Sequence, residues 1–213
     1  AYPSMNSANG QDQDVDTVLT VRELCRMIKA AHIDVAQIAE ELLDTPLGFG
    51  SGAGTIFGTT GGVMEAALRS AYNFITGENP NVDTFEVIRG EKGWREATFN
   101  LPGKKLNVAI AHGLKNASEL LEAISTGTAS YDFVEIMACP GGCVGGGGQP
   151  IHDGINSVPD RMGVLRALDK DAQVRFCHEN PMIIACYDNY LGERGSKRAH
   201  ELLHTDHTAW SLV

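Results

Sequence analysis

The hydrophobic positions in the first part of the chain mostly follow helical spacing. Residues 20–23, Thr-Val-Arg-Glu, have the spacing of a capping box, and apolar residues recur every three or four positions behind them, which predicts a helix that begins there. A second amphipathic run covers residues 35–43. Residues 63–76 show a strong helical pattern, which Gly77 can end in the left-handed conformation. A short apolar stretch at residues 15–19 predicts a strand.

The middle of the chain alternates between strand and helix patterns. Residues 94–100 and 105–111 predict two strands joined by a turn at residues 101–104, Leu-Pro-Gly-Lys. Residues 116–127 predict a capped helix. Residues 131–138 predict an apolar strand that runs directly into a loop rich in cysteine and glycine. Because strands alternate with helices, we expect an α/β fold.

The two ends of the chain differ in character. The last third is mostly helical, with Asn180 as a helix cap and Pro181 as the first helical residue. Residues 1–14 are polar and turn-rich, which predicts a surface arm or a truncated linker ahead of one domain over residues 15–213. The first residue is Ala1 rather than methionine. We therefore expect that the chain is processed, truncated or one piece of a larger assembly.

The composition is ordinary for a globular protein, since 43% of the 213 residues are apolar and 21% are charged. A formal net charge of −10 argues against a nucleic-acid partner, because such proteins need lysine and arginine to neutralise phosphates. The acidic balance also fits poorly with an anionic membrane surface, and no apolar run is long enough to span a bilayer. No export signal is visible, so we expect a cytoplasmic protein.

The candidate chemistry concentrates in residues 137–150, MACPGGCVGGGGQP. Five cysteines in a chain of this length favour reduced thiols or metal ligands over a disulfide scaffold. Cys139 and Cys143 can reach one metal centre, and thiolates favour iron–sulfur clusters or zinc. Their C-x3-C spacing, with Pro-Gly-Gly between the thiols, differs from the C-x2-C knuckles of structural zinc sites. The residues alone predict a metal site and leave the type of metal open.

Other patterns favour simpler explanations. A phosphate-binding glycine loop would continue with lysine and then serine or threonine, and Gln149 and Pro150 stand there instead. Cys25 lies on the apolar side of its predicted helix, which is typical of a buried structural thiol. His112 stands at the end of a predicted strand before a glycine and is expected to be a turn histidine whose ring nitrogens have hydrogen-bond partners.

The cysteine loop resembles the last cysteine motif of the iron–iron (FeFe) hydrogenases. Residues 57–69, FGTTGGVMEAALR, are similar to that family's FGxTGGVMEAALR segment. The runs DVDTVLTVREL, TPLG, AIAHGLKNA and HELLHTDH also match in family order. The resemblance covers almost the whole chain and identifies it as the C-terminal portion of the hydrogenase active-site domain. The family's histidine-rich tail is not catalytic, so we expect no metal role for His200 and His204.

The resemblance implies a cofactor and a reaction. Cys139 and Cys143 would be ligands of an H-cluster, which consists of a 4Fe-4S cubane and a two-iron subsite with carbonyl and cyanide ligands. Cys143 would bridge the cubane to the two-iron subsite. The protein would then be an oxidoreductase that reversibly interconverts dihydrogen with protons and electrons.

The resemblance also implies a pocket and an architecture. Met137 would line the two-iron pocket through its polarisable thioether. Phe57 and Val63 would form apolar walls, and Gly58 would lie beside the diatomic ligands. The fold would be one lobe, with part of the second, of a two-lobed α/β domain in which helices flank a parallel sheet.

Two family motifs, TSCCP and PCxxK, do not occur in the chain. In the family they supply two further cubane ligands, a proton-relay cysteine and a lysine that pairs with a cyanide ligand. The resemblance therefore implies an N-terminal companion, either a separate subunit or a missing part of the same chain. Ferredoxin or another low-potential electron carrier would be the redox partner.

Two alternatives stay open. The first is a relative that binds only a cubane and serves cytosolic iron–sulfur assembly. Phe57, Val63 and Met137 argue against it, because a cubane alone does not need a two-iron pocket. The second is a non-catalytic hydrogen sensor, although the chain shows no sensory or kinase segment.

Overall fold

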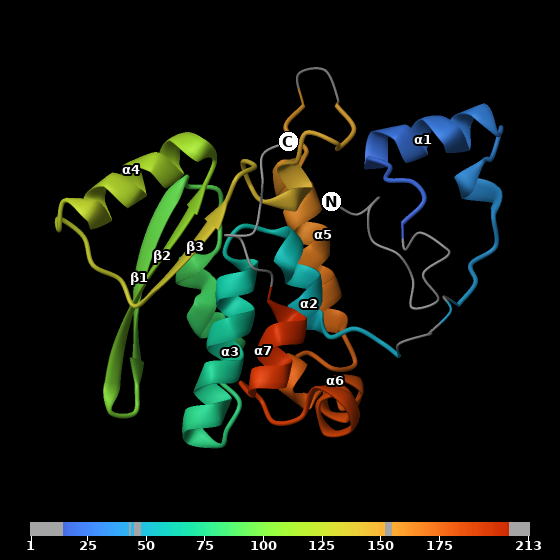
Figure 1. Ribbon diagram of the computed structural model, residues 1–213. Coiled ribbons are helices and arrows are strands. Elements are labelled where there is room, and N and C mark those ends of the chain that lie inside the picture. Colours follow the sequence, from blue (N-terminus) through green and yellow to red (C-terminus); the bar gives the residue numbers. More distant parts are fainter. Residues whose placement is uncertain (1–14, 43, 45–47, 152–154, 205–213) are drawn as a thin grey trace.

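The computed structural model describes residues 15–42, 44, 48–151 and 155–204, whose arrangement is shown in Figure 1. The strands are β1 Trp94–Leu101, β2 Lys104–His112 and β3 Phe133–Met137. The α-helices are α1 Val21–Ala30, α2 Gly52–Thr55, α3 Gly62–Thr76, α4 Leu114–Ser125, α5 Val158–Asp171, α6 Pro181–Cys186 and α7 Lys197–Leu203. Shorter helical segments are η2 Val35–Gln37, η3 Ile56–Gly58, η4 Val82–Ile88, η5 Cys143–Gly145, η6 Cys177–Glu179 and the π-helical η7 Tyr187–Leu191. The predicted arm at residues 1–14 lies outside the described residues.

The sheet has the strand order β1-β2-β3 and is mixed. β1 and β2 are antiparallel and meet at a tight turn where Leu101 pairs with Lys104. β2 and β3 are parallel, with α4 as the crossover between them. The predicted α/β class with flanking helices is confirmed, but the sheet is not wholly parallel. The reason is the short Pro102-Gly103 turn, with Gly103 at φ 76°, since so short a connection can only join antiparallel strands.

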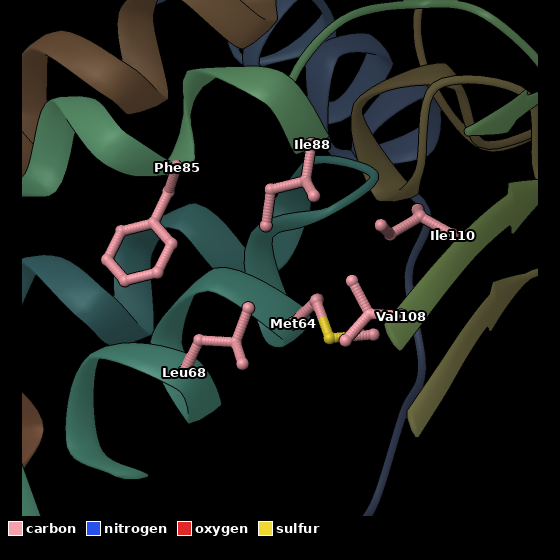
Figure 2. Close-up of a cluster of buried hydrophobic side chains, with 6 residues drawn as sticks. All are labelled: Met64, Leu68, Phe85, Ile88, Val108 and Ile110. Atoms are coloured by element: carbon pink, nitrogen blue, oxygen red, sulfur yellow. The ribbon is translucent and has the colours of Figure 1, made fainter. Parts of the chain in front are cut away.

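Each face of the sheet buries its own apolar layer. On one face Val108 and Ile110 of β2 pack against α3 and η4, as Figure 2 shows. On the other face Ala109 and Ala111 pack against Leu120 of α4. This alternation follows from the two-residue period of a strand, and it makes β2 the most buried strand of the sheet. A further layer forms where α2, η3 and α5 pack beside α3.

Several helix ends match the sequence prediction. The capping box of α1 is present, because Thr20 Oγ1 accepts from the Glu23 amide and the Glu23 carboxylate accepts from the Thr20 amide. α3 ends at Gly77 with φ 76°. The Asn180 side chain accepts from the Met182 amide at 2.9 Å and caps α6.

The N-terminal segment differs from the prediction. Residues 15–19 form no strand, and the amphipathic run at 35–42 contains only the turn η2, while residue 43 lies outside the described residues. Strands need a paired neighbour, and none lies beside these residues in the described part of the chain. The helix predicted from Asn116 begins at Leu114, and Asn116 instead donates to the His112 carbonyl at 2.7 Å.

Within the described residues, the helices are too short or too polar for any of them to cross a membrane. The longest is α3, with 15 residues.

Candidate metal centre

The cysteine loop begins where the sheet ends. β2 and β3 run parallel, and their last residues, His112 and Met137, are partners in the register. The chain then leaves β3 for residues 138–150, which carry both cysteines of the C-x3-C pair. Binding sites in α/β folds gather at the carboxyl ends of parallel strands. The sheet therefore places the loop at an edge that suits a binding site.

His112 holds the loop against this edge. Its Nδ1 accepts a hydrogen bond from the Gly141 amide at 3.0 Å, and its Nε2 lies 3.0 Å from the Glu91 carbonyl oxygen, to which it can only donate. These two partners fix the imidazole as the neutral Nε2–H tautomer. The prediction that both ring nitrogens have partners is confirmed. The sequence did not show that one partner is the cysteine loop itself, 29 residues away.

Gly142 is the point where the loop, the segment before α3 and the end of β3 meet. Its φ of 94° lies in the region that favours glycine. A Cβ at this position would lie 2.8 Å from the Thr60 nitrogen, 2.9 Å from the Gly58 oxygen and 3.0 Å from Met137 Sδ. The Thr60 amide also donates to the Gly141 carbonyl at 3.0 Å. Because residue 142 has no side chain, Gly58 and Met137 pack directly beside the cysteine loop.

The two loop cysteines are free thiols in backbone turns. Cys139 is half-buried, and its carbonyl accepts from the Gly142 amide at 3.0 Å. Cys143 is exposed, and its carbonyl accepts from the Gly146 amide at 3.0 Å. A Cβ at Gly146 would lie 4.0 Å from Cys139 Sγ, so the glycine tract passes close to this thiol.

The predicted apolar wall residues lie on different elements. Phe57, on η3, is 47% exposed and lines an apolar cavity of about 650 Å³. The opposite side of this cavity is formed by η6 and α6, including Met182 and Ile183. Val63 is half-buried in the first turn of α3 and is not one of the residues that line the cavity. The structure thus brings Gly58 and Met137 to the loop and places Phe57 beside a neighbouring cavity.

The other cysteines lie elsewhere. Cys177 Sγ is 3.1 Å from Ser70 Oγ, and Cys177 and Cys186 both line the apolar cavity. Cys25, expected to be buried, is only half-buried, because the apolar side of α1 is not covered in the described structure. Among the described residues, no group of three or more His, Cys, Asp or Glu side chains is placed to hold a metal ion.

Residues 200–204, His-Glu-Leu-Leu-His, have the HExxH spacing of zinc sites. His200, on α7, and His204, directly after its last residue, are exposed, and their rings stack with centroids 4.4 Å apart. Glu201 pairs with Lys197 at 3.6 Å. Two stacked imidazoles on an exposed surface do not enclose a site, which leaves Cys139 and Cys143 as the candidate metal ligands.

Two buried charges hold the turn that leads into α3. The Glu135 carboxylate, on β3, accepts from the Gly61 and Met64 amides at 2.5 and 2.7 Å and so caps the positive end of the helix dipole. Arg95 donates to Thr60 Oγ1 at 3.0 Å, and its burial lowers the pKa of the guanidinium. Sequence reasoning missed both residues, because Glu135 is more than 70 positions from its partners and Arg95 is 35 positions from Thr60.

A second buried network joins α3 to α5. Arg69, which is fully buried, donates to Asp169 at 2.7 Å through each of two nitrogens and to Glu65 at 2.6 Å. Burial alone would raise the pKa of Glu65, but the hydrogen bond from Arg89 and the charges of Arg166 and Arg69 hold it below its ordinary value. The network fixes α3, and with it the turn beside the cysteine loop.

The donor set can be tested against an iron–sulfur cluster. Cys139 and Cys143 offer two soft sulfur donors in a loop whose glycines let backbone amides approach closely. A 4Fe-4S cubane takes four thiolates. The loop therefore fits one side of such a cluster, and no third candidate ligand joins these two cysteines among the described residues.

Comparisons with known proteins agree with this donor chemistry. Residues 2–147 match the family model described as "Iron only hydrogenase large subunit, C-terminal domain", and residues 157–210 match the model described as "Iron hydrogenase small subunit". The chain thus combines, in one polypeptide, sequences that resemble both of these units.

Curated relatives match over most of this chain but a smaller part of their own. The NADP-reducing hydrogenase subunit HndD of Solidesulfovibrio fructosivorans is 47% identical over 200 residues, which cover 93% of this chain and 34% of the relative. The cytosolic Fe-S cluster assembly factor narfl of Xenopus tropicalis is 28% identical, over 97% of this chain and 44% of its own. The chain therefore spans less than half the length of these relatives.

The fold is also similar to solved structures. The FeFe-hydrogenase HydA1 of Chlamydomonas reinhardtii aligns with a TM-score of 0.71 and 40% sequence identity, covering 91% of this chain and 55% of that one. Together with the family model over residues 2–147, this similarity shows that the chain belongs to the iron-only (FeFe) hydrogenase family, as part of its C-terminal H-cluster domain.

Proposed function

We propose that this chain forms part of the catalytic centre of an FeFe hydrogenase that reversibly interconverts dihydrogen with protons and electrons. The observation that carries the proposal is the packing at Gly142. There Met137 and Gly58, two residues that a two-iron pocket would need, lie within about 3 Å of a single point on the cysteine loop. A loop that only had to hold a cubane would not need this arrangement.

In this proposal Cys139 and Cys143 would hold the cubane, and Cys143 would also hold the two-iron subsite. When bound, an H-cluster, with carbonyl and cyanide ligands on its two-iron subsite, supplies the chemistry of dihydrogen. The protein's own contribution is to fix the thiolates. His112 and the Thr60 amide hold Gly141, midway between the two cysteines, at the edge of the sheet.

The pocket residues have separate tasks. Met137 offers a soft thioether beside Gly142. Gly58 brings its backbone to the same point, and the absence of a side chain there makes space for Leu165, whose Cδ1 would lie 2.6 Å from a Cβ at Gly58. Phe57, at the neighbouring cavity, and Val63, in the first turn of α3, would provide apolar surface that excludes water in the complete site. Dryness strengthens the electrostatic contribution of nearby backbone amides.

An N-terminal companion supplies the other two thiolates in this proposal. Support comes from α1, which touches the glycine tract through Arg22 but has no buried residue. Val21, Leu24 and Met27 on this helix are 45, 48 and 54% exposed. An amphipathic helix with an uncovered apolar face beside the cysteine loop suits a partner that approaches the same loop.

The family resemblance also implies that a low-potential carrier such as ferredoxin exchanges electrons with the complete enzyme. The net charge of −10 argues against a nucleic acid or an anionic membrane as a partner. The cytoplasmic location stays a prediction from the sequence.

A second candidate function is iron–sulfur assembly with a cubane alone. It is favoured by the match to the Xenopus assembly factor along 97% of this chain, although the identity is 28% against 47% for the hydrogenase subunit. The packing of Met137 and Gly58 against the loop favours the hydrogenase.

The proposal is tested by hydrogen evolution with the full complex, co-produced with its companion and the cluster-maturation system. We expect wild-type protein to evolve hydrogen from a reduced dye and to contain cluster iron. Cys143→Ser should abolish hydrogen evolution, whereas the matched variant Cys186→Ser, at an exposed cysteine outside the loop, should retain it. Wild-type complex that contains iron but evolves no hydrogen would favour the assembly function.

A further inference from the structure

The glycine tract after Cys143 is bracketed by one arginine. Beyond the short turn η5, residues 146–150 form no regular structure, so their carbonyl groups need donors from other parts of the chain. Arg161, the fourth residue of α5, donates from Nη1 to the Val144 carbonyl at 3.0 Å and from Nη2 to the Pro150 carbonyl at 2.9 Å. One guanidinium thus joins the two ends of the tract.

The middle of the tract is held from the opposite side. The Arg22 side chain donates to the Gly147 carbonyl, and the Arg22 amide donates to the Gly148 carbonyl at 3.0 Å. A Cβ at Gly148 would lie 2.9 Å from Thr20 Cβ, so α1 and the tract are in close contact. Arg161 and Arg22 together engage four carbonyl groups between residues 144 and 150.

The two hydrogen bonds donated by the Arg161 guanidinium, its fork, affect the position of Cys143. Val144, which accepts from Nη1, is the next residue in the chain, and it is buried. The chain around it folds back so tightly that a Cβ at Gly145 would lie 1.9 Å from the Pro140 oxygen. A displacement of the Val144 carbonyl would therefore move Cys143, because the glycines offer no side-chain packing that could absorb it.

The charge of Arg161 has a second effect. The contact of the guanidinium with the Val144 carbonyl keeps a positive charge one residue from Cys143. A positive charge beside an iron–sulfur cluster favours the more negatively charged, reduced cluster, because net charge and hydrogen bonding set cluster potentials. A lysine would keep the charge but could not form the planar two-nitrogen fork.

We infer that Arg161 is a positioning residue for the Cys143 thiolate, whose fork fixes the loop geometry and whose charge makes the bound cluster easier to reduce. This inference rests on the proposed function only in that Cys143 ligates a cluster. The fork sets the loop geometry and the charge sets the cluster potential. Substitution by lysine, which keeps the charge without the fork, separates the two effects.

The test compares Arg161→Gln, Arg161→Lys and the control Arg194→Gln in the full complex with its companion. Arg194 lies over the Phe74 ring at 4.8 Å, and so its replacement removes the same charge outside the loop. The measurements are the electron paramagnetic resonance spectrum of the reduced cubane and its midpoint potential in a redox titration.

We expect Arg161→Gln to shift the potential to more negative values and to broaden the spectrum. Arg161→Lys should restore the potential but keep the broadened spectrum, and Arg194→Gln should match wild type in both. If Arg161→Gln loses its iron, the inference is tested by the potential and the spectrum of Arg161→Lys compared with wild type. An Arg161→Gln variant that matches Arg194→Gln, or an Arg161→Lys spectrum identical to wild type, would overturn the inference.

The same samples separate this inference from the proposed function. Wild-type complex with a cubane signal but no carbonyl or cyanide infrared bands would contradict the hydrogenase function and still allow the Arg161 comparison. Wild-type complex without any cluster signal would contradict both.

Discussion

The region around the sheet and the N-terminal segment, residues 15–42, hold their shape in different ways. Around the sheet, side chains such as Ile56, Met64 and Ile110 are completely buried. In the N-terminal segment neither α1 nor η2 has a buried residue, and Leu42 is fully exposed. An isolated helix of ten residues is marginal in water, so α1 depends on its local cap and on its contact with the glycine tract.

This difference shows how the two regions contribute to the site. The packed region, which consists of the sheet and the helices that cover it, fixes the cysteine loop through contacts between residues far apart in sequence. The N-terminal segment reaches the same loop from the opposite side while its apolar face stays exposed. Substitutions in the packed region and in the N-terminal segment should therefore differ in how far their effects extend.

Removing the buried guanidinium of Arg69 should destabilise the packed region most. Arg69→Met leaves the carboxylates of Glu65 and Asp169 buried without their central partner, which we expect to lower the free energy of unfolding by about 3–5 kcal/mol. The measurement is urea unfolding. The control Lys115→Ala removes an exposed partner of Glu119 and should cost less than about 1 kcal/mol. Equal losses of unfolding free energy in Arg69→Met and Lys115→Ala would contradict the role of the buried network in holding the packed region.

Acid should weaken the packed region through the same network. Burial acts to raise the pKa of Glu65 and Asp169, but hydrogen bonds and charges of the arginines outweigh it and lower both pKa values from their ordinary 4.5 and 3.8. Their stabilisation is therefore complete above pH of about 4.5 and is lost as the pH falls through the lowered folded values. Urea unfolding between pH 7 and 3 should show this decline, and Asp169→Asn should make it shallower. An unchanged slope in Asp169→Asn would argue against the network as its source.

A methyl group at Gly142 should disturb the junction of the packed region and the loop. The positive φ and the approach of 2.8 Å to the Thr60 nitrogen strain any side chain there, so Gly142→Ala should cost about 1–3 kcal/mol and reduce cluster iron in the full complex. Gly147→Ala is the matched control, because a Cβ at that position meets nothing within 4 Å. Similar iron contents in the two variants would show that the junction does not hold the loop.

Removing the cap of α1 should have the smallest and most local effect. Thr20→Ala deletes the hydroxyl that accepts from the Glu23 amide, which is worth about 1 kcal/mol to the helix. Amide hydrogen exchange should become faster within α1, while urea unfolding of the packed region stays unchanged. A matching loss of global stability would mean that α1 is an integral part of the packed region.

Local signals in the sequence predicted the features that depend on neighbouring residues. The capping box at Thr20, the glycine stop at Gly77 and the Pro-Gly turn at residues 102–103 all act within a few positions. The C-x3-C loop was also visible, although its identity as part of a hydrogenase came from family resemblance rather than from its spacing. The roles of Cys139 and Cys143 as ligands stay predictions.

The features that the sequence did not reveal depend on distant partners or on missing ones. Glu135 caps α3 from 71 to 74 positions away, and Arg69 meets Asp169 across 100 positions. No local pattern encodes such contacts. No strand forms at residues 15–19 for the opposite reason, since a short apolar stretch becomes a strand only where a neighbouring strand pairs with it.

The proposed hydrogenase centre is tested most directly by an infrared spectrum of the full complex, purified anaerobically from its native host. We predict sharp bands in the carbonyl and cyanide stretching regions, because the loop of Cys139 and Cys143 is proposed to hold a two-iron subsite together with its companion. A spectrum without such bands, from protein that still contains iron, would contradict this proposal and identify a site that holds a cubane alone.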